Sequence, residues 1–163
     1  MKRLLIIALM AVLSLTAGAQ GKWDVSYRQA DELIGQDAKS IYMYEAKGIG
    51  TVVVWDWSKP DFRLITDKGF FKATYCQGGK YYPVTVGFYD DNGNLEQKFS
   101  IQMLEEDNHG GKYIATGDFY IGGRGNIKKI MARMKSGKGY VRMVVDLYNK
   151  PPFDIKITPY IRK

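Results

Sequence analysis

The sequence is poor in the residues that most often carry crosslinks and metals. Among its 163 residues there is one cysteine, Cys76, and one histidine, His109. A single cysteine cannot form an intramolecular disulfide, so the fold must be held by its apolar core, and a disulfide scaffold is excluded. One histidine without ligand spacing argues against a structural zinc site. We interpret Cys76 as a small buried hydrophobe; pairing between chains and a catalytic pair with His109 are the alternatives.

Signatures of catalysis and of nucleotide binding are also missing. The chain has no G-x-S-x-G, no H-E-x-x-H and no G-x-x-x-x-G-K-[ST] pattern, which argues against the common hydrolase and phosphate-loop classes. Asp90, Asn92 and Asn94 alternate as in a calcium loop, but Leu95 stands where that loop needs glycine, so we predict a turn. We therefore predict no catalytic residue, no metal and no cofactor. A two-carboxylate glycosidase stays open, because the sequence selects no pair among 17 acidic residues.

Long apolar runs are confined to the N-terminus. Lys2 and Arg3 precede an apolar segment that ends in small residues at 17–19, a pattern typical of a cleaved secretory signal. The segment is shorter than the ~20 apolar residues that cross a bilayer core. We expect residues 1–19 to be removed and residues 20–163 to be exported as one domain, to the periplasm, the cell surface or the medium. No later segment predicts a transmembrane helix.

Acidic residues are fewer than basic ones, 17 against 24. The signal segment contains two basic residues and no acidic residue, so residues 20–163 carry 22 basic and 17 acidic residues, a charge of +5. A modest positive field suits acidic glycans, phospholipid head groups or an acidic protein. Export argues against nucleic acid as a partner, and simple solubility is the alternative reason for the charge.

Strand signals dominate residues 20–163. Tyrosine and β-branched residues fill short segments between turns rich in Gly, Asn, Asp and Pro. The clearest hairpin has strands at 82–89 and 95–104, because Asn92-Gly93 adopts the positive φ of tight turns. Other strands are expected at 24–29, 40–45, 51–57, 62–66, 70–76, 112–121, 139–148 and 153–161. The pattern predicts an all-β fold, an antiparallel sandwich of about seven to nine strands.

One amphipathic helix is expected over residues 126–135. Asn126 is its predicted N-cap, and Gly137 its C-terminal stop. Apolar residues at spacings i, i+3, i+4 and i+7 predict its buried face: Ile127, Ile130, Met131 and Met134. The opposite face is basic, with Lys128, Lys129, Arg133 and Lys135. We interpret the helix as a lid on the core with a solvated charged face; contact with a membrane or an acidic partner is the alternative.

Two groups of residues are candidates for ligand contact. The glycine-rich segment 122–125 precedes the helix, so an anion could bind near Arg124, Asn126 and Lys128, or the segment is a plain connection. The second group is aromatic: Trp55 and Trp57 share a face of their predicted strand, as Tyr42 and Tyr44 do of theirs. Such rings either stack a sugar or peptide, or pack in the core. The candidate contacts are Tyr42, Trp55, Trp57, Arg124, Lys128 and Arg133.

The order of features over residues 23–161 carries a resemblance. Trp23 is followed by the segment 31–35 (DELIG), and the segment 135–142 (KSGKGYVR) precedes the last strands. In this order the chain resembles small exported β-sandwich proteins of bacterial envelopes, many of them uncharacterised. The resemblance implies an envelope-associated binding or accessory role. We expect a non-catalytic domain that contacts an envelope protein or a polysaccharide; a small extracellular hydrolase and a secreted enzyme inhibitor with a protruding loop are the alternatives.

Overall fold

The computed structural model describes residues 21–30, 33, 35, 37–76, 79–106, 110–116 and 123–162. The expected signal segment at 1–19, the residue His109 and the segment 117–122 lie outside these residues, as does the side chain of Cys76. The predictions made for them therefore stay predictions.

Ten strands and one helix make up the described part of the chain, and the strands pair antiparallel. This confirms the all-β prediction. The strands are β1 (Lys22–Arg28), β2 (Lys39–Ala46), β3 (Gly50–Val54), β4 (Arg63–Thr66), β5 (Thr74–Cys76), β6 (Gly79–Tyr89), β7 (Leu95–Glu105), β8 (Tyr113–Ala115), β9 (Tyr140–Leu147) and β10 (Lys150–Ile157). The helix is α2 (Arg124–Lys135).

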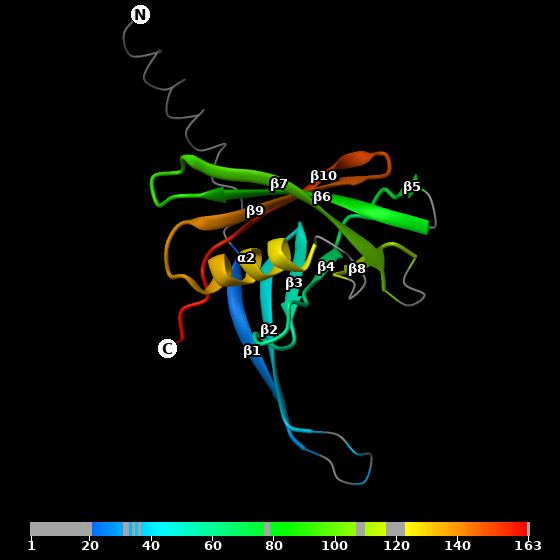
Figure 1. The fold of residues 1–163 in the computed structure, drawn as a ribbon. Coiled ribbons are helices and arrows are strands. Elements are labelled where there is room, and N and C mark those ends of the chain that lie inside the picture. The colour runs from blue at the N-terminus through cyan, green and yellow to red at the C-terminus, as the bar shows by residue number, and fades with distance from the viewer. Residues whose placement is uncertain are drawn as a thin grey trace, which may run out of the picture.

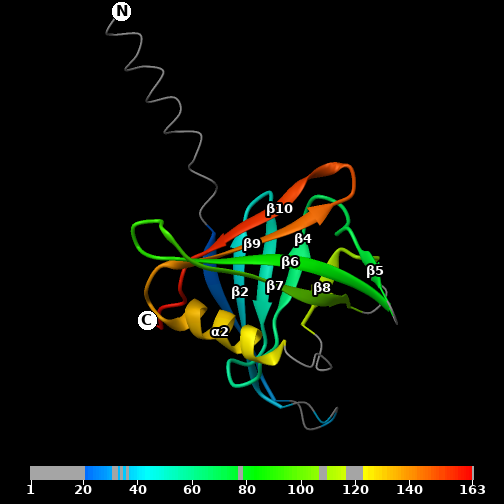
Figure 2. The ribbon, with the colours of Figure 1, turned by 45° about the horizontal axis from the view of Figure 1, so that its top comes forward.

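The strands form one bent sheet in the order β1-β2-β3-β4-β8-β7-β6-β9-β10, with β5 paired to β6. Strands β6, β7, β9 and β10 run across β1 to β4 (Figures 1 and 2). The two halves face each other as sandwich layers do, but Ala115 of β8 pairs with Arg63 of β4 and with Leu104 of β7. The layers are therefore two halves of one hydrogen-bonded sheet, with ten strands instead of seven to nine.

The core lies between the two halves of the sheet and is closed by α2. Alternation of apolar and polar residues along the strands supplies it, since every second side chain points inward. In β9, for example, Val141, Met143 and Val145 are buried. The four apolar helix residues predicted from their spacing are all buried in the same cluster. Complete burial of one such side chain contributes roughly 1.5–3 kcal/mol.

The two ends of α2 compare differently with the prediction. The helix begins at Arg124 with Gly123 as N-cap, so Asn126 lies inside the helix and its assignment as N-cap was wrong. The reason is that the chain already has helical dihedrals at Gly123, φ −84° and ψ −33°, so the helix starts before Asn126. At the other end, Gly137 has φ +71°, which confirms it as the stop. Glycine adopts this conformation without a Cβ clash.

The strand expected over 51–57 ends early, at Val54. Asp56 accepts hydrogen bonds from the backbone N–H and the hydroxyl of Ser58, at 2.8 and 2.7 Å. This local turn bends the chain, because an Asp side chain bonded two residues ahead mimics a backbone turn. Trp55 and Trp57 therefore do not share a strand face, and that prediction was wrong. The hairpin of β6 and β7 is confirmed, with Gly93 at φ +83°.

Candidate functional site

A cluster of aromatic rings joins β1, β2, the turn after β3 and the C-terminal segment. Its members are Trp23, Tyr42, Tyr44, Trp57 and Tyr160. Ring centroids lie 5.4 Å apart between Tyr42 and Trp57, 5.7 Å between Trp23 and Trp57, and 5.8 Å between Trp57 and Tyr160, which are stacked. These are favourable aromatic separations. Trp57 thus packs against three other rings of the cluster.

Strands β1 and β2 continue beyond the rest of the sheet as a two-stranded ribbon. Pairing of β1 with β2 extends to Arg28↔Lys39, whereas β3 pairs with β2 only from Ala46 to Tyr42. The ribbon protrudes from the body of the protein in Figure 1. At its base, the turn after β3 moves away from β2 and leaves a space between them.

That space is a cavity of about 450 Å³, which we call the aromatic cavity. All three aromatic candidates line it, although they come from different parts of the fold. Tyr42 comes from β2, and Trp55 and Trp57 from the turn after β3. The lining residues are Ala38, Lys39, Ser40, Tyr42, Trp55, Asp56 and Trp57.

Polar and charged groups lie around the two indoles, and Arg63 among them lies outside the lining of the aromatic cavity. The Nζ of Lys39 lies 5.1 Å and the Cζ of Arg63 lies 4.9 Å from the ring centroid of Trp55, within cation–π range. The indole N–H groups of Trp55 and Trp57 are buried and have no acceptor in the part of the chain that the structure describes. An unpaired buried donor costs about 1–3 kcal/mol. Hydrogen bonds from Ser58 lower the pKa of Asp56, so this carboxylate is ionised at neutral pH.

A row of apolar side chains on the ribbon, which we call the ribbon stripe, continues outward from the aromatic cavity, on the face that carries Tyr42. Trp23, Val25 and Tyr27 alternate along β1 and share one face, and the register places Val25 opposite Tyr42 and Tyr27 opposite Ser40. Val25 is 43% and Tyr27 65% exposed. Sequence reasoning missed Tyr27, although the alternation in the expected strand at 24–29 would have identified it.

A second cavity, of about 610 Å³, lies at the N-terminal end of α2, and we call it the basic cavity. Arg124 and Lys128 line it, as the anion hypothesis expected, but Asn126 does not. Lys59 and Arg63 complete a set of four basic side chains. Sequence reasoning missed these two, because nothing local connects them with a helix more than 60 residues later.

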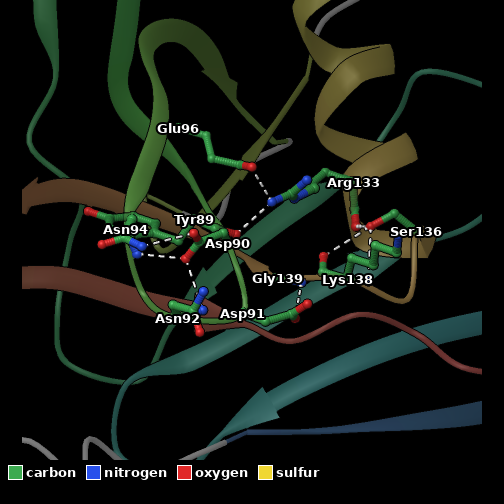
Figure 3. Close-up of polar contacts among 10 residues, drawn as sticks. All are labelled: Tyr89, Asp90, Asp91, Asn92, Asn94, Glu96, Arg133, Ser136, Lys138 and Gly139. Carbon is green, nitrogen blue, oxygen red and sulfur yellow. Dashed lines mark hydrogen bonds and ion pairs between the residues drawn. The ribbon is translucent and has the colours of Figure 1, made fainter.

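Arg133 lies at the opposite end of α2 and lines neither cavity. Its guanidinium donates to the carbonyl oxygen of Tyr89 at 2.6 Å and forms an ion pair with Glu96. Figure 3 shows these contacts beside the β6–β7 turn, where Asp90 accepts from the backbone N–H and the side-chain amide of Asn94. Arg133 therefore joins the helix to the hairpin, unlike the solvated face that the sequence predicted.

Catalysis and metal binding both need several polar side chains to converge on one point. No group of three His, Cys, Asp or Glu side chains able to hold a metal occurs in the described ranges. Among the described residues, the aromatic cavity is lined by one carboxylate, Asp56, and the basic cavity by one, Asp61. The two carboxylates that a glycosidase uses in one cleft are therefore not brought together by the described lining of either cavity. Of the helices in the described residues, none is long and apolar enough to cross a bilayer.

Comparison with known proteins adds no relative. A scan against protein-family models finds no match to this chain, and searches of curated proteins and of solved structures find none either.

Proposed function

We propose that the protein is an exported, non-catalytic module that binds a polysaccharide in the aromatic cavity. The observation that carries the proposal is the convergence of Tyr42, Trp55 and Trp57 on one cavity of about 450 Å³. Ligand sites typically combine aromatic walls with a few placed polar groups. Sugar rings suit such a site, because they present apolar C–H faces to the rings and hydroxyl groups to polar neighbours.

The polar rim supplies partners for sugar hydroxyls. The ionised carboxylate of Asp56 accepts hydrogen bonds, the Lys39 ammonium donates them, and the Ser40 hydroxyl does both. The β2 residues from Lys39 to Ile41 have no pairing with β3, so backbone groups on that side of the ribbon add further donors and acceptors.

The shape of the face favours a polymer over a single sugar. The ribbon stripe continues from the cavity through Val25 to Tyr27, with increasing exposure. A chain of sugars lying along this stripe would contact both the cavity and Tyr27. Large aromatic side chains contribute most of the binding energy in many interfaces.

Titration calorimetry tests the proposal. The protein is titrated with a glucan, a xylan, a mannan and a galactan, each as the neutral polymer and as its carboxymethylated form. We expect saturable binding of at least one polymer. Trp55→Ala should abolish it, and Tyr27→Ala should weaken it about tenfold. Because Tyr27 is 65% exposed, its variant should keep the fold.

Tyr75→Ala is the matched control, since Tyr75 is 74% exposed and lies on β5, away from the ribbon. It should leave affinity unchanged. Equal binding by the Tyr27→Ala, Trp55→Ala and control proteins, with unchanged circular dichroism, would contradict the proposal. Absence of binding to all eight polymers would also overturn it and favour a protein partner for the protruding ribbon, as in the inhibitor alternative.

A further inference from the structure

The basic cavity is positively charged by composition. Its four basic side chains come from two separate segments, Lys59 and Arg63 after β3, and Arg124 and Lys128 on α2. Asp61 is the acidic residue among the described lining residues, and its carboxylate accepts a hydrogen bond from the Thr116 hydroxyl at 3.1 Å. Among the described lining residues, positive charges therefore outnumber the negative charge.

Groups next to the basic cavity also affect its charge. Arg63 forms an ion pair with Glu106. The first turn of α2 contains no acidic residue, and its N-cap, Gly123, makes no side-chain capping bond. The N-terminus of a helix carries a partial positive charge, and Arg124, the basic residue of the first turn, adds to it. An anion in the cavity would lower this repulsion.

The two cavities are neighbours. Residues 55–57 line the aromatic cavity and residues 58–61 line the basic cavity, so one turn separates them. Arg63 lines the basic cavity while its guanidinium lies 4.9 Å from the ring centroid of Trp55. A ligand held against Trp55 thus has a positively charged cavity next to it.

From this juxtaposition we infer that the polysaccharide is acidic, and that the basic cavity binds a carboxylate or sulfate group of the sugar next to the one at Trp55. The inference rests on the proposed function, because the aromatic cavity supplies the neighbouring sugar subsite. Arg124 and Lys128 contact the oxyanion, and the N-terminus of α2 contributes its dipole. Neutral sugars occupy the aromatic cavity alone and bind more weakly.

The same titrations test the inference through the ratio of affinities for the carboxymethylated and the neutral form of one polymer. We expect a ratio above one, and expect Lys128→Gln to reduce it about two- to fivefold. Lys129→Gln is the matched control, since it removes the same charge from the adjacent helix residue, which does not line the cavity. Added salt should reduce the ratio for the wild-type protein more than for Lys128→Gln.

The outcomes separate this inference from the proposed function. Equal loss in the Lys128→Gln and Lys129→Gln proteins would mean non-specific attraction to a basic surface and would overturn the inference. Binding that depends on Trp55 but not on polymer charge would overturn it and leave the proposed function standing. Titration with sodium sulfate and sodium acetate forms a further arm. Lys128-dependent binding of either small anion, without preference for the charged polymer, would assign the cavity to a free anion and overturn the saccharide assignment.

Discussion

The two ends of α2 carry the same type of side chain in opposite electrostatic situations. At the C-terminal end, Arg133 contacts Glu96 and the carbonyl oxygen of Tyr89, and positive charge is favoured by the helix dipole. At the N-terminal end, Arg124 and Lys128 face a cavity, and positive charge is disfavoured by the same dipole. The difference indicates that the helix dipole favours the basic side chain at one end and opposes the basic side chains at the other.

This contrast distinguishes basic residues that stabilise the fold from basic residues that are suited to binding a ligand. A residue whose charge lowers the energy of the folded protein needs no partner outside it. A residue placed against the dipole costs stability, and natural proteins usually accept such costs at functional sites. Substitutions at the two ends should consequently change stability in opposite directions.

The largest effect is expected at the C-terminal end. Arg133→Gln removes the ion pair with Glu96 and the bond to the Tyr89 carbonyl, and should lower the free energy of unfolding by about 1–2 kcal/mol. Glu96 is 48% exposed, so most of the loss comes from the carbonyl contact. Urea unfolding measures the change. Affinity for the carboxymethylated polymer should not change; a large loss would place Arg133 in the ligand site.

A smaller effect of opposite sign is expected at the N-terminal end. Asn126 lies in the first turn of α2, so Asn126→Asp places a negative charge near the positive end of the dipole. The free energy of unfolding should rise by about 0.3–1 kcal/mol at low salt. The gain should shrink as salt is added. Lower stability of this variant at neutral pH would contradict the account of this end.

The smallest effect concerns pH and the turn that receives Arg133. Hydrogen bonds from the side-chain amide and the backbone N–H of Asn94 hold the pKa of Asp90 below its ordinary value of 3.8. A carboxyl whose pKa is lowered by folding stabilises the fold above its ordinary pKa, and that contribution is lost as pH falls through the lowered value. Thermal unfolding between pH 5 and pH 2 should show a shallower loss in Asp90→Asn than in the wild type. Parallel curves would contradict this.

The sequence predicted the parts of the fold that depend on neighbouring residues. The Asn92-Gly93 turn and the buried face of α2 follow from local chemistry and from spacing, and both are confirmed. The end of β3 was missed because hydrophobic alternation continues through Trp57, although Asp56 and Ser58 form a local turn there. A side chain that bonds the backbone two residues ahead competes with strand pairing.

The candidate site was less predictable, because its two cavities depend on pairing between distant segments. Tyr42 and Trp57 lie close together because β2 continues beyond the end of its pairing with β3. Lys59 and Lys128 line the same cavity because α2 closes the core beside the turn after β3. No sequence pattern within one segment predicts which residues of a distant segment will lie beside it. The sequence therefore indicated which types of side chain can bind a ligand. Strand register and helix packing determine which of them line the same cavity.

The contact between Trp23 and Thr158 has a consequence for the connectivity of the chain. The indole N–H of Trp23 donates to the carbonyl oxygen of Thr158 at 2.6 Å, so the start of the first strand and the segment after the last strand lie side by side. The first and the last segments of the described part of the chain therefore lie next to each other, although the sheet is open. A short peptide could join the two segments covalently, and new ends could be cut at the turn around Asn149. Such a circular permutant should retain both cavities, because neither includes a residue at the junction or at the cut.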